Sequence, residues 1–129
     1  MNLKSSMSAV VGFAFVLAAC GGGEPDPALG EEIYTTAREV GMGRPTTCTA
    51  CHSLGEPRPG DGPSRSQIRE NAATRVAGMS AEDYLRESIL DPSAHVEEGY
   101  FDNLMPKVYG ELLTEQEIEH LIAFLLAEG

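Results

Sequence analysis

The sequence predicts an all-α fold in a single domain, and two features of its hydrophobic pattern point to this class. Apolar residues recur at helical spacing in segments near both ends of the chain, whereas no run of useful length alternates between apolar and polar residues as a strand would. No internal repeat is present, and no glycine-rich phosphate-binding loop precedes a predicted helix. The length of 129 residues is enough for one domain.

Residues 1–19 are predicted to be a secretory signal. Lys4 provides a positive charge, an apolar stretch over 10–17 follows, and the segment is too short to cross a bilayer comfortably. Its end, Leu17-Ala18-Ala19-Cys20, resembles a bacterial lipobox, at which signal peptidase cuts before a cysteine whose thiol is acylated. We therefore expect a lipoprotein signal over 1–19 and a lipid-anchored flexible tether over 20–27. The alternative is an ordinary cleaved signal followed by a chance cysteine.

The remaining residues, 28–129, are predicted to form the folded domain, which opens with a helix over 28–40. Pro27 suits the first turn of this helix, and Gly41 and Gly43 are expected to end it. Its apolar residues recur at helical spacing and comprise Leu29, Ile33, Ala37 and Val40.

Two further helices are marked by N-capping signals. Ser80 and Asp83 form one capping pair, and Asp91-Pro92 ends the helix that follows them. The buried face of this helix is predicted to comprise Tyr84, Leu85, Ile89 and Leu90. Thr114 and Glu117 form a second capping pair before the terminal helix. The apolar stripe of that helix is predicted to comprise Ile118, Leu121, Ile122 and Leu125.

Long irregular segments separate the predicted helices. Residues 45–63 are punctuated by Pro, Gly and Ser, and we expect a loop there with a helical turn at 48–52. Residues 93–113 are predicted to form a second loop. Few apolar side chains occur over 41–79, so this part of the chain needs a large buried cofactor to fold.

The chain is strongly acidic, with a formal net charge of −11. Removal of Lys4 with the signal leaves eight basic and twenty acidic side chains, a net charge of −12. This balance argues against nucleic acid as a partner and favours electrostatic steering toward a basic patch on a partner protein. The alternative is a surface that is merely well solvated.

The motif Cys48-Thr49-Ala50-Cys51-His52 carries the chemistry of the chain. Two thiols at this spacing reach the two vinyl groups of one haem, and the histidine that follows supplies an imidazole to its iron. A zinc site would need a second pair of ligands, and a thioredoxin-like dithiol would need a βαβ setting, and the sequence provides neither. The chain has three cysteines, so with Cys20 acylated none remains for a disulfide.

Met105 is the predicted sixth ligand of the iron. It lies in an irregular segment well downstream of His52, and Pro106 favours an extended conformation at this methionine. His95, in the same segment, is the main alternative, and an open sixth position is a further one. The remaining candidates are expected to be packing or surface residues, and they are Met42, Met79 and His120.

Over residues 28–129 the chain resembles a class I cytochrome c, a family with three to five helices around one covalently attached haem c. The attachment motif and Met105-Pro106 carry this resemblance, together with Gly62-Pro63. The resemblance implies that the Pro63 carbonyl accepts the Nδ1 proton of His52. It also implies that Gly30 and Tyr34 of the first helix cross Leu121 and Phe124 of the last.

The middle of the chain, from Arg75-Val76-Ala77-Gly78 to Gly99-Tyr100, is similar to the cytochrome c domain of haem-copper oxidase subunit II and to free-standing relatives. Arg65 departs from that group, which usually has a leucine there that packs near the haem. Arg65, Arg69 and Arg75 are candidates for pairing with the haem propionates, and the resemblance favours Arg75. The alternative is that these arginines face solvent.

The resemblance implies a carrier of single electrons rather than an enzyme. The predicted signal and lipobox imply export to the periplasm or the outer face of the cell membrane, where the lipid holds the protein. The implied partners are a terminal oxidase, a quinol-oxidising complex or a periplasmic dehydrogenase. One alternative is a fixed haem subunit of a respiratory or photosynthetic complex. Another is a ligand-binding or peroxidatic haem protein with an open sixth position.

Overall fold

The computed structural model describes residues 23–128, which form a helical domain. In chain order its elements are α1 (Pro27–Thr35), η1 (Cys48–Ala50), α2 (Arg65–Asn71), η2 (Ala72–Thr74), α3 (Ala81–Leu90), α4 (Tyr109–Leu112) and α5 (Glu115–Leu126). Over these residues β structure is limited to an isolated bridge between Arg38 and Thr46. The all-α prediction is therefore confirmed.

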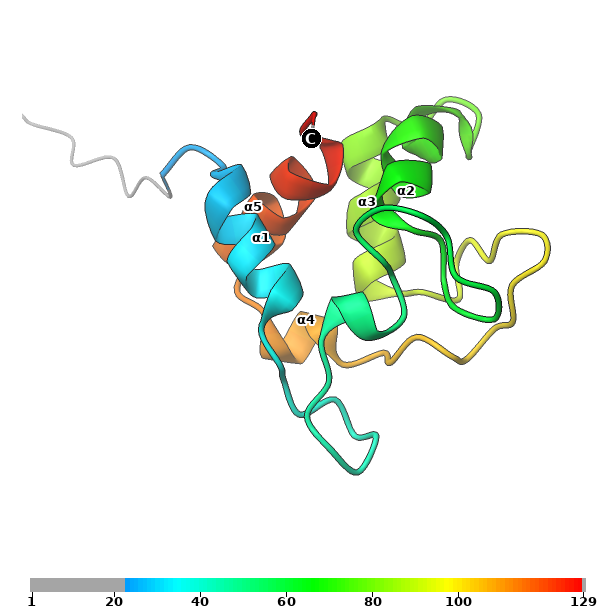
Figure 1. The fold of residues 1–129 in the computed structure, drawn as a ribbon. Helices are drawn as coiled ribbons and strands as arrows, with labels where there is room; N and C mark the ends of the chain where they lie inside the picture. The colour runs from blue at the N-terminus through cyan, green and yellow to red at the C-terminus, as the bar shows by residue number, and fades with distance from the viewer. Residues whose placement is uncertain (1–22, 129) are drawn as a thin grey trace, which may run out of the picture.

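The terminal helices α1 and α5 cross and form one side of the domain, while α2 and α3 form the other (Figure 1). Gly30 lies at the crossing, where a Cβ atom would come within 2.0 Å of the His120 carbonyl oxygen. The rings of Tyr34 and Phe124 lie 5.3 Å apart in a tilted arrangement. The predicted crossing of Gly30 and Tyr34 with the last helix is thus confirmed.

The first helix is shorter than the sequence predicted. It ends at Thr35, and Arg38 in the segment that follows exchanges two backbone hydrogen bonds with Thr46, of 2.8 and 2.9 Å. Two successive β-branched threonines, which favour extended backbone, stand at this point. Leu29 was expected on the buried stripe but is 45% exposed, whereas Gly30, Ile33 and Tyr34 form the buried face.

The helices α3 and α5 follow their predictions closely. Ser80 caps α3, and Thr114 and Glu117 form the predicted capping box of α5. The apolar stripe of α5 is buried as expected, with Phe124 added to it. Leu90 is a correction, because this last residue of α3 is 39% exposed rather than part of the buried face.

Two helices were not predicted, α2 and α4. The capping box of Ser64 and Gln67 at the start of α2 was a sequence signal for it, but Ile68 is the one large apolar residue among its seven and gives no helical period. α4 has four residues and lies inside the segment predicted as a loop over 93–113. A single turn of helix is too short to produce a periodic pattern.

Residues 23–26, which the sequence assigned to the tether, are held against α5. The Asp26 backbone N–H donates to His120 Nδ1 at 2.8 Å, and Gln116 Nε2 donates to the Gly23 carbonyl at 2.9 Å. Contacts with α5 therefore extend back to Gly23. The predicted signal over 1–19 and the predicted acylation of Cys20 lie outside the described residues. Between residues 23 and 128 no helix has the length and hydropathy needed to cross a bilayer.

Candidate functional site

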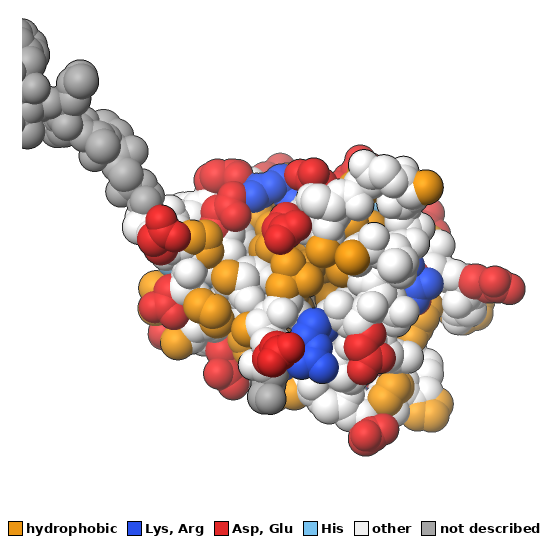
Figure 2. All heavy atoms as spheres, turned by 90° about the horizontal axis from the view of Figure 1, so that it is seen from above, with side chains coloured by type: hydrophobic (Ala, Val, Ile, Leu, Met, Phe, Trp, Pro, Cys, Tyr) orange, Lys and Arg blue, Asp and Glu red, His pale blue; other side chains and the backbone are white. Residues whose placement is uncertain are grey.

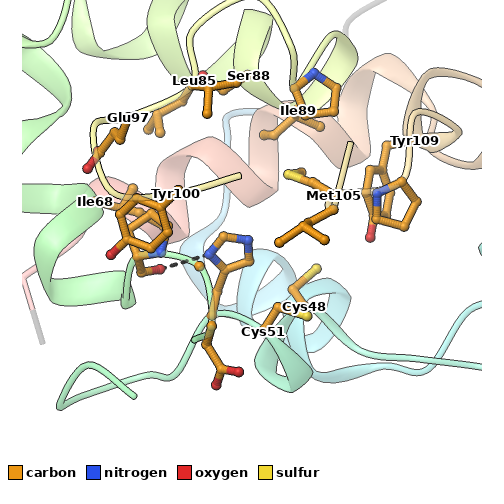
Figure 3. Close-up of a pocket in the computed structure, with 18 of the residues that line it drawn as sticks. Cys48, Cys51, Ile68, Leu85, Ser88, Ile89, Glu97, Tyr100, Met105 and Tyr109 are labelled. Atoms are coloured by element: carbon orange, nitrogen blue, oxygen red, sulfur yellow. Dashed lines mark hydrogen bonds between the residues drawn. The ribbon is translucent and has the colours of Figure 1, made fainter. Parts of the chain in front are cut away.

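A cavity of about 230 Å³ lies between the two sides of the domain (Figure 3). Its walls are largely apolar and include Ile68, Ala72, Leu85, Ile89, Leu121 and Leu125. Fourteen side chains form the buried hydrophobic core of the described chain, and eight of them also line this cavity. The domain is therefore built around an apolar space rather than around a continuous side-chain core.

The two cysteines of the predicted motif lie together at one edge of this cavity (Figure 3). The short helix η1 holds them there, with the Cys51 and His52 N–H groups both donating to the Cys48 carbonyl, at 3.1 and 2.8 Å. Both thiols are free, and burial raises the pKa of the Cys48 thiol to about 11. The helical turn predicted at 48–52 is confirmed over Cys48–Ala50.

The His52 imidazole lines the cavity and is fixed by its surroundings. Its Nδ1–H donates to the Pro63 carbonyl at 2.8 Å (dashed in Figure 3), which leaves Nε2 as the unprotonated nitrogen that a metal requires. Gly62 packs against the ring so closely that a Cβ there would lie 2.4 Å from His52 Cε1. Burial lowers the pKa of His52 below its ordinary value and favours the neutral, ligating form. The predicted pairing of His52 with Pro63 is present.

Arg58 holds the loop that follows the motif, a role that was not predicted from the sequence. Its guanidinium donates to the Thr49 and Ala50 carbonyls at 2.7 and 3.1 Å and pairs with Asp61 at 2.6 Å. These contacts satisfy carbonyl groups of the short helix η1. No local sequence pattern predicts these contacts of Arg58, because its partners depend on the path of the loop.

Met105 projects into the cavity from the irregular segment between α3 and α4, across from the two cysteines (Figure 3). Two other candidate ligands also reach the cavity wall. Met42 is one of them, and it is 56% exposed. His95 is the other, and its Nε2 is hydrogen-bonded to Glu87 at 2.7 Å. Met79 packs against the core outside the cavity wall, and the His120 ring accepts a hydrogen bond from the backbone of Asp26.

The three arginines considered for the propionates have other partners or lie off the cavity wall. Arg75 pairs with Glu97 at 2.7 Å, and it is Glu97 that lines the cavity. Arg65 donates to the Phe124 and Ala127 carbonyls at 2.7 and 2.6 Å and lies over the Phe124 ring, so it caps the C-terminus of α5. These contacts give Arg65 a role within the fold. Arg69 is partly exposed on α2.

A comparison with protein families shows that residues 27–127 match the family model for Cytochrome c. The chain belongs to the cytochrome c family. A comparison with curated proteins found no match. Family membership makes haem c, covalently attached through a Cys-x-x-Cys-His motif, the cofactor of this cytochrome c, and makes haem-based electron transfer its general function.

The residues of this cytochrome c fit a haem group on three counts. The cavity walls are apolar, two free thiols stand at one edge, and a neutral imidazole with a fixed tautomer lines it. Over residues 23–128 no group of three His, Cys, Asp or Glu side chains is arranged to hold a metal ion. When bound, haem supplies an iron that alternates between the ferrous and ferric states. The chain supplies attachment through Cys48 and Cys51, an imidazole from His52, and walls that exclude water.

Proposed function

We propose that the protein is a membrane-anchored monohaem cytochrome c that passes single electrons between respiratory partners, with His52 and Met105 as the axial ligands of its iron. The observation that supports this ligand pair most directly is the position of Met105. It projects from an irregular segment into the same cavity as His52, from the side across from the cysteines. A soft thioether stabilises ferrous iron, so this pair gives a higher reduction potential than two imidazoles would.

Replacing Met105 with alanine is expected to abolish the weak red absorption band that arises between methionine sulfur and ferric iron. The ferric iron should become high-spin, and the reduction potential should fall, because water or a weaker donor takes the place of the thioether. Met79→Ala is the matched control, since Met79 packs against the core outside the cavity wall. Absorption spectra of the oxidised and reduced proteins measure both outcomes.

Two results would overturn this ligand pair. If the wild-type ferric protein is already high-spin and its reduced, ferrous form binds carbon monoxide readily, the sixth position is open and the ligand-binding or peroxidatic function replaces the carrier. If Met105→Ala keeps a low-spin spectrum and only loss of His95 changes it, His95 is the ligand. We do not expect His95 to be the ligand, because its Nε2 is already hydrogen-bonded to Glu87.

The surface near the cavity supports a partner with an apolar centre and a basic rim. Phe101 and Leu104 line the cavity and are 79% and 61% exposed. Acidic residues on the adjoining loops include Glu56, Asp61, Glu98 and Asp102. Figure 2 shows the same excess of acidic over basic side chains on one whole face of the domain. A terminal oxidase or a quinol-oxidising complex with a basic docking patch would suit this surface.

Acylation of Cys20 is expected to place the mature protein on the outer face of a membrane. In cells that express the full chain, the protein should sediment with membranes and incorporate labelled palmitate, and Cys20→Ser should incorporate none, with its haem spectrum unchanged. The reason is that two or three acyl chains hold a protein to a bilayer, whereas the described domain contains no membrane-spanning helix. Palmitate incorporation that survives Cys20→Ser would contradict the lipid anchor at this residue.

A further inference from the structure

The segment that carries Met105 has very few polar contacts with the rest of the domain. Residues 92–107 contain no helix or strand, and their hydrogen bonds are formed largely within the segment and with the adjoining Asp91. Within the described chain, two polar contacts reach beyond it, from His95 to Glu87 and from Glu97 to Arg75. We refer to residues 92–107 as the distal loop.

The contact between Glu97 and Arg75 is the more protected of the two. The oxygen and nitrogen lie 2.7 Å apart, and the side chains are 16% and 34% exposed, respectively. Arg75 follows η2, on the far side of the cavity from α1 and α5, so the ion pair joins the distal loop to a different part of the fold. Glu97 itself lines the cavity, as Figure 3 shows. Partial burial reduces the screening of this pair by solvent and salt.

The second contact reinforces the first from two residues away. His95 Nε2 lies 2.7 Å from a carboxylate oxygen of Glu87 on α3, and the His95 ring lies 5.9 Å from the Tyr84 ring of the same helix. His95 and Glu97 both line the cavity, and both partners lie outside the distal loop. The first half of the distal loop is thus fixed to the rest of the domain at two points. Its second half is tied to the first by the hydrogen bond from Ser93 to Asp102, and Met105 packs against the core.

We propose that the Arg75–Glu97 ion pair, supported by Glu87–His95, is a latch that positions the distal loop and so holds the Met105 thioether at the iron. In this role Arg75 is a positioning residue that acts through Glu97. The inference rests on the proposed function, since it takes Met105 as the sixth ligand. It assigns Arg75 a partner in the chain, whereas the resemblance to related domains assigned it to a haem propionate.

The strength of the latch can be measured by letting an added ligand compete with Met105 for the iron. Exogenous imidazole binds ferric iron only when Met105 is displaced, so its apparent affinity rises with the fraction of protein in which the thioether is off the iron. Loss of a partly buried ion pair should raise this fraction. We expect Glu97→Gln to tighten imidazole binding by about two- to fivefold, the change that corresponds to an ion pair of this exposure.

The experiment titrates the wild-type and variant ferric holoproteins with imidazole and follows the methionine-to-iron band. Glu119→Gln is the matched control, because it breaks an ion pair with Arg86 that joins α3 to α5 and leaves the distal loop untouched. If Glu97→Gln lowers the melting temperature as much as Glu119→Gln does but leaves the imidazole affinity at its wild-type value, the pair is merely structural and the latch is wrong.

A double-mutant cycle separates the latch from a propionate role for Arg75. If Arg75 acts through Glu97, then Arg75→Gln, Glu97→Gln and the double variant should all bind imidazole with similar affinity, since each removes the same contact. If Arg75 instead pairs with a propionate, Arg75→Gln and the double variant should share a larger change that Glu97→Gln lacks, and the latch fails. Absence of the methionine band in the wild-type protein would contradict the proposed ligand pair itself. That result is distinct from the two outcomes of the double-mutant cycle.

Discussion

Replacing Cys48 and Cys51 together with serine is expected to yield a chain that has lost both its covalent haem and most of its helical structure. The reason lies in the composition of the core, because eight of the fourteen buried core side chains also line the cavity. In addition, no residue between Gly41 and Pro63 is buried. Without the cofactor, these side chains would surround a large void, and the loops would lose the group that orders them.

The measurement combines haem staining of a denaturing gel with far-ultraviolet circular dichroism. The double variant should show no haem that survives denaturation and only a small part of the wild-type helical signal. Cys20→Ser is the control, because Cys20 lies outside the cavity motif and its replacement should leave both readings unchanged. A double variant that shows the full helical signal without haem would mean that the side chains alone stabilise the fold.

The parts of the fold that the sequence predicted are those set by local signals. The helices α3 and α5 each combine an N-cap with an apolar stripe, and both features depend on residues a few positions apart. The Cys48–His52 motif is local in the same way, since its chemistry follows from its spacing. The error at Val40 has the opposite origin. Val40 is buried, as its place on the stripe suggested, but it lies in extended chain beyond the end of α1.

The parts that the sequence did not predict depend on contacts between distant residues. Arg65 reaches α5 across 59 positions, and nothing near it in the sequence marks the carbonyl groups that it caps. The contact between Arg75 and Glu97 in the distal loop likewise joins residues far apart in the sequence and was not predicted. Such partners follow from the path of the chain in three dimensions, which composition and periodicity leave open.

Replacing Gly30 with alanine is expected to lower the free energy of unfolding of the holoprotein by about 3 kcal/mol or more. In an open helix this change would instead stabilise the fold by about 1 kcal/mol, because alanine favours helix more than glycine does. At Gly30, however, the new Cβ would lie 2.0 Å from the His120 carbonyl oxygen and 2.6 Å from Phe124 Cβ. The first of these atoms belongs to the backbone of α5, so the clash is relieved only if the two helices move apart.

Gly110→Ala is the matched control for this prediction, because it adds the same methyl group to another helix. Its new Cβ would meet Leu90 Cδ2 at 3.3 Å, and that atom is the end of a flexible side chain that can turn aside. Denaturant unfolding of the two holoproteins, followed by circular dichroism, should therefore show a large loss for Gly30→Ala and little change for Gly110→Ala. Equal stabilities in the two variants would contradict this prediction, because they would mean that α1 and α5 can accommodate a methyl group between Gly30 and His120.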